Sequence, residues 1–123
     1  MRFLQSFHRR TLVAVATGLA LVVLPAAAAT AQDSGPTIAA EDEDFNPVEL
    51  HVTPGTTITW TNTGAENHTV TSDDGTTFDS GTLAPGDPFT FTFTDPGAYP
   101  YYCTIHGGPG GQGMAGLIIV APQ

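Results

Sequence analysis

Residues 89–94 read Phe-Thr-Phe-Thr-Phe-Thr, and the turn-forming Asp-Pro-Gly of residues 95–97 follows directly. Apolar and hydroxyl side chains alternate along this run, as they do in a β-strand with one buried face and one wet face. Residues 57–61 repeat the alternation as Thr-Ile-Thr-Trp-Thr. The side chains predicted to point into a core are Ile58, Trp60, Phe89, Phe91 and Phe93.

Segments of this kind are separated by turn signals along the rest of the chain. Thr53-Pro54-Gly55 and Ala84-Pro85-Gly86 place Pro before Gly as residues 95–97 do, which is typical of tight turns. The sequence shows no helical period, internal repeat or sign of a second domain. The predicted strands are 37–41, 48–52, 56–62, 68–72, 77–79, 87–94, 98–103 and 115–121. Short strands at this spacing predict an all-β, two-sheet sandwich or barrel.

The N-terminal segment has the composition of a secretory signal peptide. Residues 1–10 contain all three arginines, residues 11–24 are apolar, and Ala29-Thr30-Ala31 is a small-x-small cleavage site. Pro25 leaves the apolar run shorter than the roughly 20 residues of a membrane-spanning helix.

We therefore expect a signal peptide at 1–31, a flexible tail at 32–36 and the folded domain at 37–123. The expected location is the periplasm or the extracellular space, with no membrane insertion after cleavage. Either general secretion or twin-arginine export fits the Arg9-Arg10 pair.

The segment after residue 31 contains all twelve acidic residues and no lysine or arginine. Such a surface repels phosphate backbones, which excludes nucleic acid as a partner. It attracts partner proteins with basic surfaces, in a manner that depends on ionic strength. Solubility in a saline or acidic environment is an alternative reason for the acidity, and composition does not distinguish the two.

Cys103 is the only cysteine, so an exported chain cannot form an internal disulfide. His106 follows three residues later, Met114 is the only methionine besides Met1, and His68 lies upstream. Two imidazoles, one thiolate and a weak axial thioether are the ligands of a mononuclear blue-copper site. The alternative is an inert buried cysteine, which does not account for the nearby histidine.

Copper suits this set of side chains because a thiolate favours Cu(I) while imidazoles bind both oxidation states. A Cys2His2 zinc site would need a second cysteine. The enzymatic alternative is a Cys103–His106 nucleophile pair, but no strand-to-helix elbow or oxyanion-hole pattern accompanies it. Gln112 is the alternative axial ligand to Met114, since an amide oxygen can replace the thioether.

The strand pattern also places these residues. We expect Cys103 to end a strand, His106 to lie in the following loop, and His68 to come from across the sandwich. If Cys103 points inward, alternation turns Tyr101 inward and Tyr102 outward. Tyr102 is then either an electron conduit or a partly exposed strand aromatic.

Tyr99 shares the inward parity of Cys103 and follows the turn at residues 95–97. Its alternative role is structural, with the hydroxyl tying that corner as tyrosine corners do in sandwiches.

Residues 97–106, Gly-Ala-Tyr-Pro-Tyr-Tyr-Cys-Thr-Ile-His, and 114–120, Met-Ala-Gly-Leu-Ile-Ile-Val, resemble the C-terminal half of plastocyanins and amicyanins. Residues 60–62 and 68–70 resemble the segment that carries the first ligand histidine in those families. The resemblance spans 37–121 and implies an eight-stranded Greek-key cupredoxin fold. It also implies one copper ion held by His68, Cys103, His106 and Met114.

By the same resemblance, the edge of His106 should protrude through an apolar patch, lined here by Pro109 and the glycines, where redox partners dock. Two features depart from those families. The interval from His106 to Met114 is longer, which affects the axial bond and the reduction potential. Thr69 stands where asparagine is frequent, and we expect its hydroxyl to bond the ligand loop and its N–H to reach the thiolate.

The sequence thus favours an exported, monomeric blue-copper electron carrier that cycles Cu(II)/Cu(I) and is not an enzyme. The alternatives are a copper-binding or delivery module without an electron-carrier role, and a metal-free immunoglobulin-like adhesion sandwich.

Overall fold

The computed structural model describes residues 16–26 and 34–123. The chain divides into two units, Met1–Ala31 and Gln32–Gln123. Residues 16–26 have neither helix nor strand, and their side chains are exposed. Within the described residues, no helix combines the length and apolar character needed to span a membrane. The predicted cleavage site at residues 29–32 lies outside the described residues, so the signal peptide and tail stay predictions.

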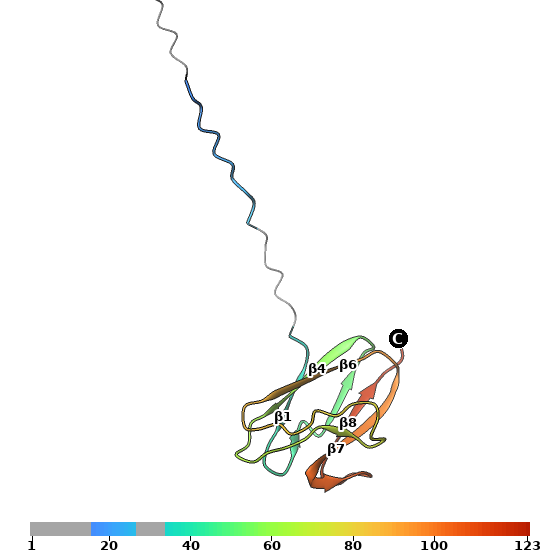
Figure 1. The fold of residues 1–123 in the computed structure, drawn as a ribbon. Helices are drawn as coiled ribbons and strands as arrows, with labels where there is room; N and C mark the ends of the chain where they lie inside the picture. The colour runs from blue at the N-terminus through green and yellow to red at the C-terminus, as the bar shows by residue number, and fades with distance from the viewer. Residues whose placement is uncertain (1–15, 27–33) are drawn as a thin grey trace, which may run out of the picture. The chain divides into compact units, whose positions relative to one another are not determined.

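The second unit consists of two four-stranded sheets (Figure 1). The first has the order β2 (Phe45–Asn46), β1 (Thr37–Ala40), β4 (Thr56–Asn62) and β6 (Pro88–Phe93). The second has the order β3 (Glu49–Val52), β8 (Gln112–Val120), β7 (Gly97–Gly108) and β5 (Thr71–Ser72). The pairs β1–β4 and β3–β8 are parallel, and the other pairs are antiparallel. The expected all-β, eight-stranded sandwich is confirmed.

Individual strands differ from the prediction in instructive places. The predicted strand 77–79 is reduced to an isolated bridge between Asp79 and Thr71. Phe78 is buried in the core, and its N–H and carbonyl bond to Ser72. The predicted strand 68–72 shortens to β5, and the two-residue strand β2 was not predicted. Both hairpin strands β7 and β8 are longer than predicted, because their pairing continues through Gly107 and Gly113.

Turn chemistry fixes the ends of the strands. Gly55 and Gly86 both have φ of 90°, a conformation that glycine adopts without strain and that Pro-Gly turns require. The hydroxyl of Tyr99 donates to the carbonyl of Asp95 at 2.7 Å, so the expected tyrosine corner is present.

The core between the sheets is mainly aromatic. Ile58, Trp60 and Phe93 are fully buried, while Phe89 and Phe91 are partly buried and pack against them, as predicted. The Trp60 ring meets Tyr101 edge-on at 5.5 Å between centroids. Aromatic pairs of this kind contribute about 0.5–1.5 kcal/mol beyond the burial of their surface.

The Tyr101 ring packs over Gly116 in a space that any side chain larger than glycine would fill. Tyr101 on β7 lies opposite Gly116 on β8, and Tyr101 is 1% exposed. A Cβ on Gly116 would lie 2.4 Å from both the ring carbon Cζ and the hydroxyl of Tyr101. The ring is enclosed by Trp60 and Phe45, so it cannot move aside. The part of β7 that leads to Cys103 is therefore held in register with β8 by the Tyr101 ring packed over Gly116.

We predict that Gly116→Ala lowers the free energy of unfolding by about 1–3 kcal/mol, the usual cost of overpacking. Chemical denaturation of the purified variant measures this change. Gly108→Ala is the matched control on the same hairpin, since a Cβ there meets nothing within 4 Å. Equal stabilities of the two variants would contradict the proposed packing.

Candidate metal centre

Cys103 lies on β7 and points into the sandwich, with 0% of its surface exposed. Tyr101 shares that inward face, and Tyr102 lies half-buried on the other, as alternation predicted. The predictions that Cys103 ends the strand and that His106 lies in a following loop are both wrong, because β7 continues to Gly108. The register with β8 is irregular between Tyr102 and Gly107. This irregular stretch includes the strand positions of Cys103 and His106 and lets both side chains point towards one site.

The turn of the hairpin beyond His106 depends on glycine. A Cβ on Gly107 would lie 2.6 Å from the carbonyl oxygens of Gln112 and Met114. Gly113 has φ of 62°, and a Cβ there would lie 2.5 Å from the carbonyl oxygen of His106. The two strands therefore approach more closely than side chains allow, which returns the chain to the site at Met114.

His68 lies on the segment that crosses from β4 to β5. Its N–H donates to the carbonyl of Leu83 at 3.0 Å, and the N–H of Leu83 donates back at 2.7 Å. This bridge sets the side chain of His68 inside the molecule with 0% exposure. The predicted strand start at His68 is wrong, because His68 forms only an isolated bridge with Leu83 on the segment that joins β4 in one sheet to β5 in the other. The predicted approach of His68 to Cys103 from a separate segment of the chain is present.

The three predicted donors form a tight triangle. Cys103 Sγ lies 3.8 Å from His68 Nδ1 and 3.7 Å from His106 Nδ1, and the two nitrogens are 3.2 Å apart. A point equidistant from all three lies about 2.1 Å from each, close to the about 2.0–2.3 Å of imidazole and thiolate bonds to a first-row metal such as zinc. The donor set therefore fits one metal ion, in the trigonal His2Cys arrangement typical of blue copper.

Met114 and Gln112 occupy different environments. Met114 is 1% exposed and lines a cavity beside His106, together with Gly113, Glu43 and Asp44. Gln112 is exposed on the hairpin opposite Gly108. Of the two axial candidates, Met114 is thus the one buried at the site.

Thr69 links the His68 segment to β7. Its backbone N–H donates to Cys103 Sγ at 3.4 Å, and its hydroxyl accepts the N–H of Thr104 at 2.8 Å. Both contacts were expected for a threonine at this place. A sulfur ligand that accepts a backbone N–H is held in one orientation.

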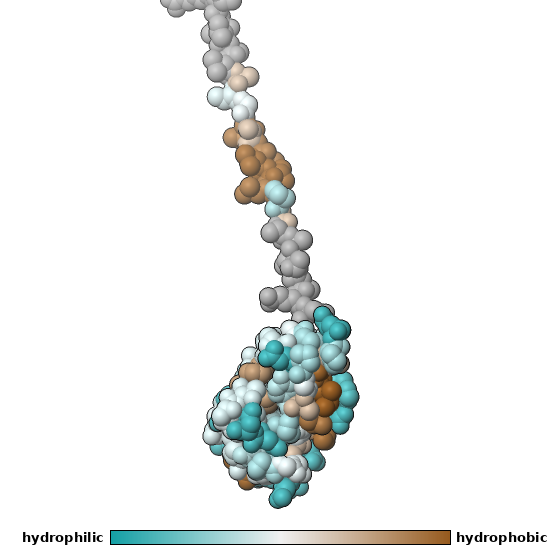
Figure 2. Space-filling view, turned by 90° about the vertical axis from the view of Figure 1, so that its right-hand side faces the viewer, coloured by the Kyte–Doolittle hydropathy of each residue, from teal (hydrophilic) through white to brown (hydrophobic). Residues whose placement is uncertain are grey.

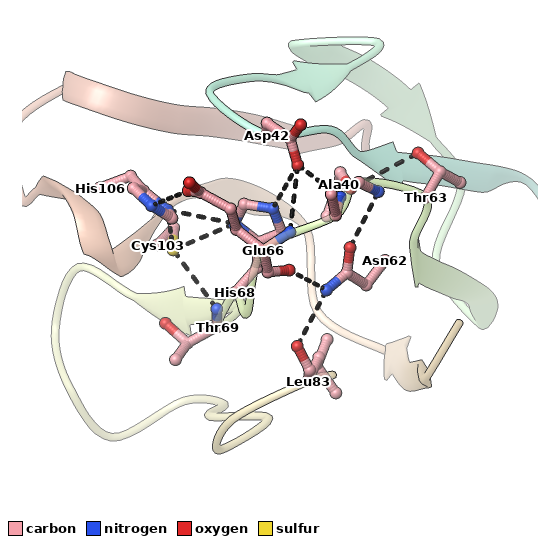
Figure 3. A network of polar contacts seen from close by, with 12 residues as sticks. Ala40, Asp42, Asn62, Thr63, Glu66, His68, Thr69, Leu83, Cys103 and His106 are labelled. Atoms are coloured by element: carbon pink, nitrogen blue, oxygen red, sulfur yellow. Dashed lines mark hydrogen bonds and ion pairs between the residues drawn. The ribbon is translucent and has the colours of Figure 1, made fainter. Parts of the chain in front are cut away.

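Asn62 builds the loop before His68, a role that the sequence pattern did not predict. Its side-chain NH2 donates to the carbonyls of Glu66 at 2.7 Å and Leu83 at 2.9 Å, and its oxygen accepts the N–H of Gly64 at 3.0 Å. Asn62 is buried at the end of β4 (Figure 3). A polar residue that ends an apolar strand just before a Thr-Gly turn was the available signal.

Two carboxylates lie on the far side of the histidine rings (Figure 3). Glu66 Oε2 is 2.7 Å from His106 Nε2, whereas Asp42 Oδ1 is 3.9 Å from His68 Nε2. Neither residue was singled out from the sequence. The expected apolar surround of His106 is therefore incomplete: Ile105 is 52% exposed nearby, but carboxylates also border the ring.

Burial, together with the charge of His106, lowers the pKa of His68 from 6.5, although Asp42 and Glu66 oppose the shift. The His68 ring is therefore neutral at physiological pH, which is the form that binds a metal.

The comparison with known families agrees with this geometry. Residues 12–120 match the family model of the cupredoxin-like domain. The chain belongs to the cupredoxin-like family. The resemblance to cupredoxins inferred from residues 97–120 is thereby confirmed.

Individual cupredoxins show how far the similarity reaches. Chloroplastic plastocyanin of Tetradesmus obliquus is 31% identical over 86 residues, covering 62% of this chain and 57% of that protein. Amicyanin of Paracoccus denitrificans is 33% identical over 86 residues, covering 67% of this chain and 66% of that protein. The solved purple cupredoxin from Nitrosopumilus maritimus aligns with a TM-score of 0.61 and 30% identity, covering 70% of this chain and 99% of that chain.

This cupredoxin thus spans less than two thirds of the length of the two curated relatives. The family model covers residues 12–120, which include the three donors.

The lowered pKa of His68 predicts how the metal-free protein responds to acid. Below pH 6.5 the unfolded chain binds a proton at this histidine before the folded chain does, so stability falls as pH falls through this window. The slope is at most about 1.4 kcal/mol per pH unit.

Urea unfolding between pH 7 and pH 5 measures the slope. His68→Gln should reduce it, whereas His51→Gln, which changes an exposed histidine, should leave it in place. An unchanged slope in His68→Gln would count against the assignment.

Proposed function

We propose that this cupredoxin is a type 1 (blue) copper protein that carries single electrons between redox partner proteins. The supporting observation is the buried triangle of Cys103 Sγ and the Nδ1 atoms of His68 and His106. Bound copper supplies a one-electron Cu(II)/Cu(I) couple at such a site. One electron then arrives from a reduced partner and leaves to an oxidised one, with no bond made or broken in a substrate.

The chain's own residues keep the site rigid. His68 is held by its bridge to Leu83, and Cys103 accepts the N–H of Thr69. Met114 is our proposed axial ligand, because its thioether is buried beside His106. Ligands fixed by backbone bonds change little between oxidation states, which favours rapid electron transfer.

The electron route to the surface follows from burial. Among the three donors, His68 and Cys103 are 0% exposed, while the His106 side chain is 23% exposed. We propose His106 as the main electron port. Tyr102, which is joined to Cys103 through the backbone and half-buried on the outer face of β7, is the proposed second route.

The proposed partners are redox proteins with basic surfaces. The side of the domain drawn in Figure 2 is mostly hydrophilic, with apolar surface confined to patches. All twelve acidic residues follow residue 31, so attraction to basic partners should weaken with salt.

We propose an exported monomer without enzymatic activity, formed by residues 32–123 after removal of residues 1–31. If the protein readily loses copper to an acceptor protein and shows no reversible one-electron wave in voltammetry, it is a copper-delivery module instead.

The first test is optical and EPR spectroscopy of the copper-loaded protein. We expect an intense thiolate-to-copper charge-transfer band, because Cys103 supplies the thiolate. Cys103→Ser should abolish the band, and His51→Gln, far from the donors in the sequence and exposed, should retain it. Persistence of the band in Cys103→Ser would rule out the proposed site.

The axial ligand is tested by substituting each of the two candidates, Met114 and Gln112, in a separate variant. Met114→Gln should change the EPR parameters and lower the reduction potential, because a harder oxygen ligand stabilises Cu(II). Gln112→Ala should leave both unchanged, since that side chain is exposed. The opposite pattern would assign the axial position to Gln112.

A further inference from the structure

Glu66 covers the outer edge of the one donor histidine that reaches the surface. Its Oε2 lies 2.7 Å from Nε2 of His106, while Nδ1 of the same ring belongs to the donor triangle (Figure 3). A carboxylate in this position accepts the Nε2–H bond and leaves the Nδ1 lone pair free for a metal. Such a partner also raises the basicity of the ligand nitrogen.

An exposed ion pair is usually weak, because two flexible side chains must be ordered to form it. The Glu66 side chain is 60% exposed, but its backbone is held at two points. Its N–H donates to Asp42 Oδ1 at 3.2 Å, and its carbonyl accepts from Asn62 Nδ2 at 2.7 Å. The neighbouring N–H of Ala65 donates to the same Asp42 oxygen at 2.6 Å. The backbone of Glu66 is thus fixed beside the ring, and only its side chain has to be ordered to form the contact.

The second histidine lacks this arrangement. His68 Nε2 is buried without a hydrogen-bond partner among residues 34–123, and Asp42 Oδ1 lies 3.9 Å away. Burial and the Leu83 bridge hold His68, whereas His106 lies on an irregular part of β7 and is partly exposed. Glu66 therefore supports the histidine that the fold constrains least.

We propose that Glu66 is a positioning residue of the metal centre. It holds the His106 ring with Nδ1 towards the metal, and its charge stabilises the more highly charged oxidised state. The consequence is tighter retention of copper and a lower reduction potential than the three donors and Met114 alone would give. This inference rests on the proposed function.

The test compares three variants in the copper-loaded protein by voltammetry and by competition with a copper chelator. Glu66→Ala removes both the charge and the hydrogen-bond acceptor. Glu66→Gln removes the charge but keeps an amide oxygen that can accept from Nε2–H. Glu43→Ala is the matched control, because Glu43 is exposed and borders the cavity beside His106 without bonding to the ring.

We expect Glu66→Ala to weaken copper binding about tenfold or more, the usual effect of losing such a ligand partner. Its reduction potential should rise by more than that of Glu43→Ala, and Glu66→Gln should recover part of the copper affinity. Glu66→Ala and Glu43→Ala that match in both affinity and potential would overturn the inference. If the unaltered protein lacks the charge-transfer band, the proposed function itself fails, so the two failures are distinguishable.

Discussion

The contacts of Thr69 connect the two segments on which the metal centre depends. Its N–H donates to Cys103 Sγ, and its hydroxyl accepts the N–H of Thr104. The hydroxyl of Thr71 donates to the Thr69 hydroxyl in turn. Because His68 precedes Thr69 directly, any shift of this segment against β7 would change the donor triangle and break these bonds together. Coupled bonds in a buried setting are stronger than separate ones, so the geometry of the site is a property of the whole crossing segment.

The aromatic core extends this constraint to the middle of β7. Tyr101 is two residues from Cys103, and its ring contacts Phe45 at 4.8 Å and Trp60 at 5.5 Å between centroids. Burial raises the pKa of Tyr101 to about 12, so the ring stays neutral in the apolar core. Gly116 fixes the register between β7 and β8, which places Met114 two residues before it on an inward-facing position. Packing near the middle of the hairpin therefore determines where the thioether lies.

The sequence predicted the features that depend on local periodicity. Its predictions failed where tertiary contacts determine the conformation or the role of a residue. Alternation located β4 and β6 and turned Cys103 inward, and the chemistry of four side chains indicated the donor set. The segment 77–79 has strand-like residues, yet only Asp79 forms a bridge, and Phe78 fills the core after a turn. His68 looked like a strand residue because β-branched residues follow it, although a single bridge to Leu83 sets its place. Glu66 gave no signal, because its importance arises from a ring 40 residues away in the sequence.

The absence of lysine and arginine after residue 31 determines what the carboxylates can do. Without cationic side chains, the carboxylates that form bonds do so with histidine rings, hydroxyls, an asparagine amide and backbone N–H groups. Asp74 accepts the Thr77 hydroxyl and the N–H groups of Thr76 and Thr77, and these bonds hold its pKa far below the usual range. Asp42 closes the loop before His68 in the same way, and Asp73 accepts the N–H of Gly110 at the tip of the β7–β8 hairpin. Carboxylates used as loop caps order the segments that lead to the donors while leaving the outer surface negative. These loop-capping carboxylates can therefore both order the segments around the donor triangle and attract a basic partner. Neither role needs an additional charged group.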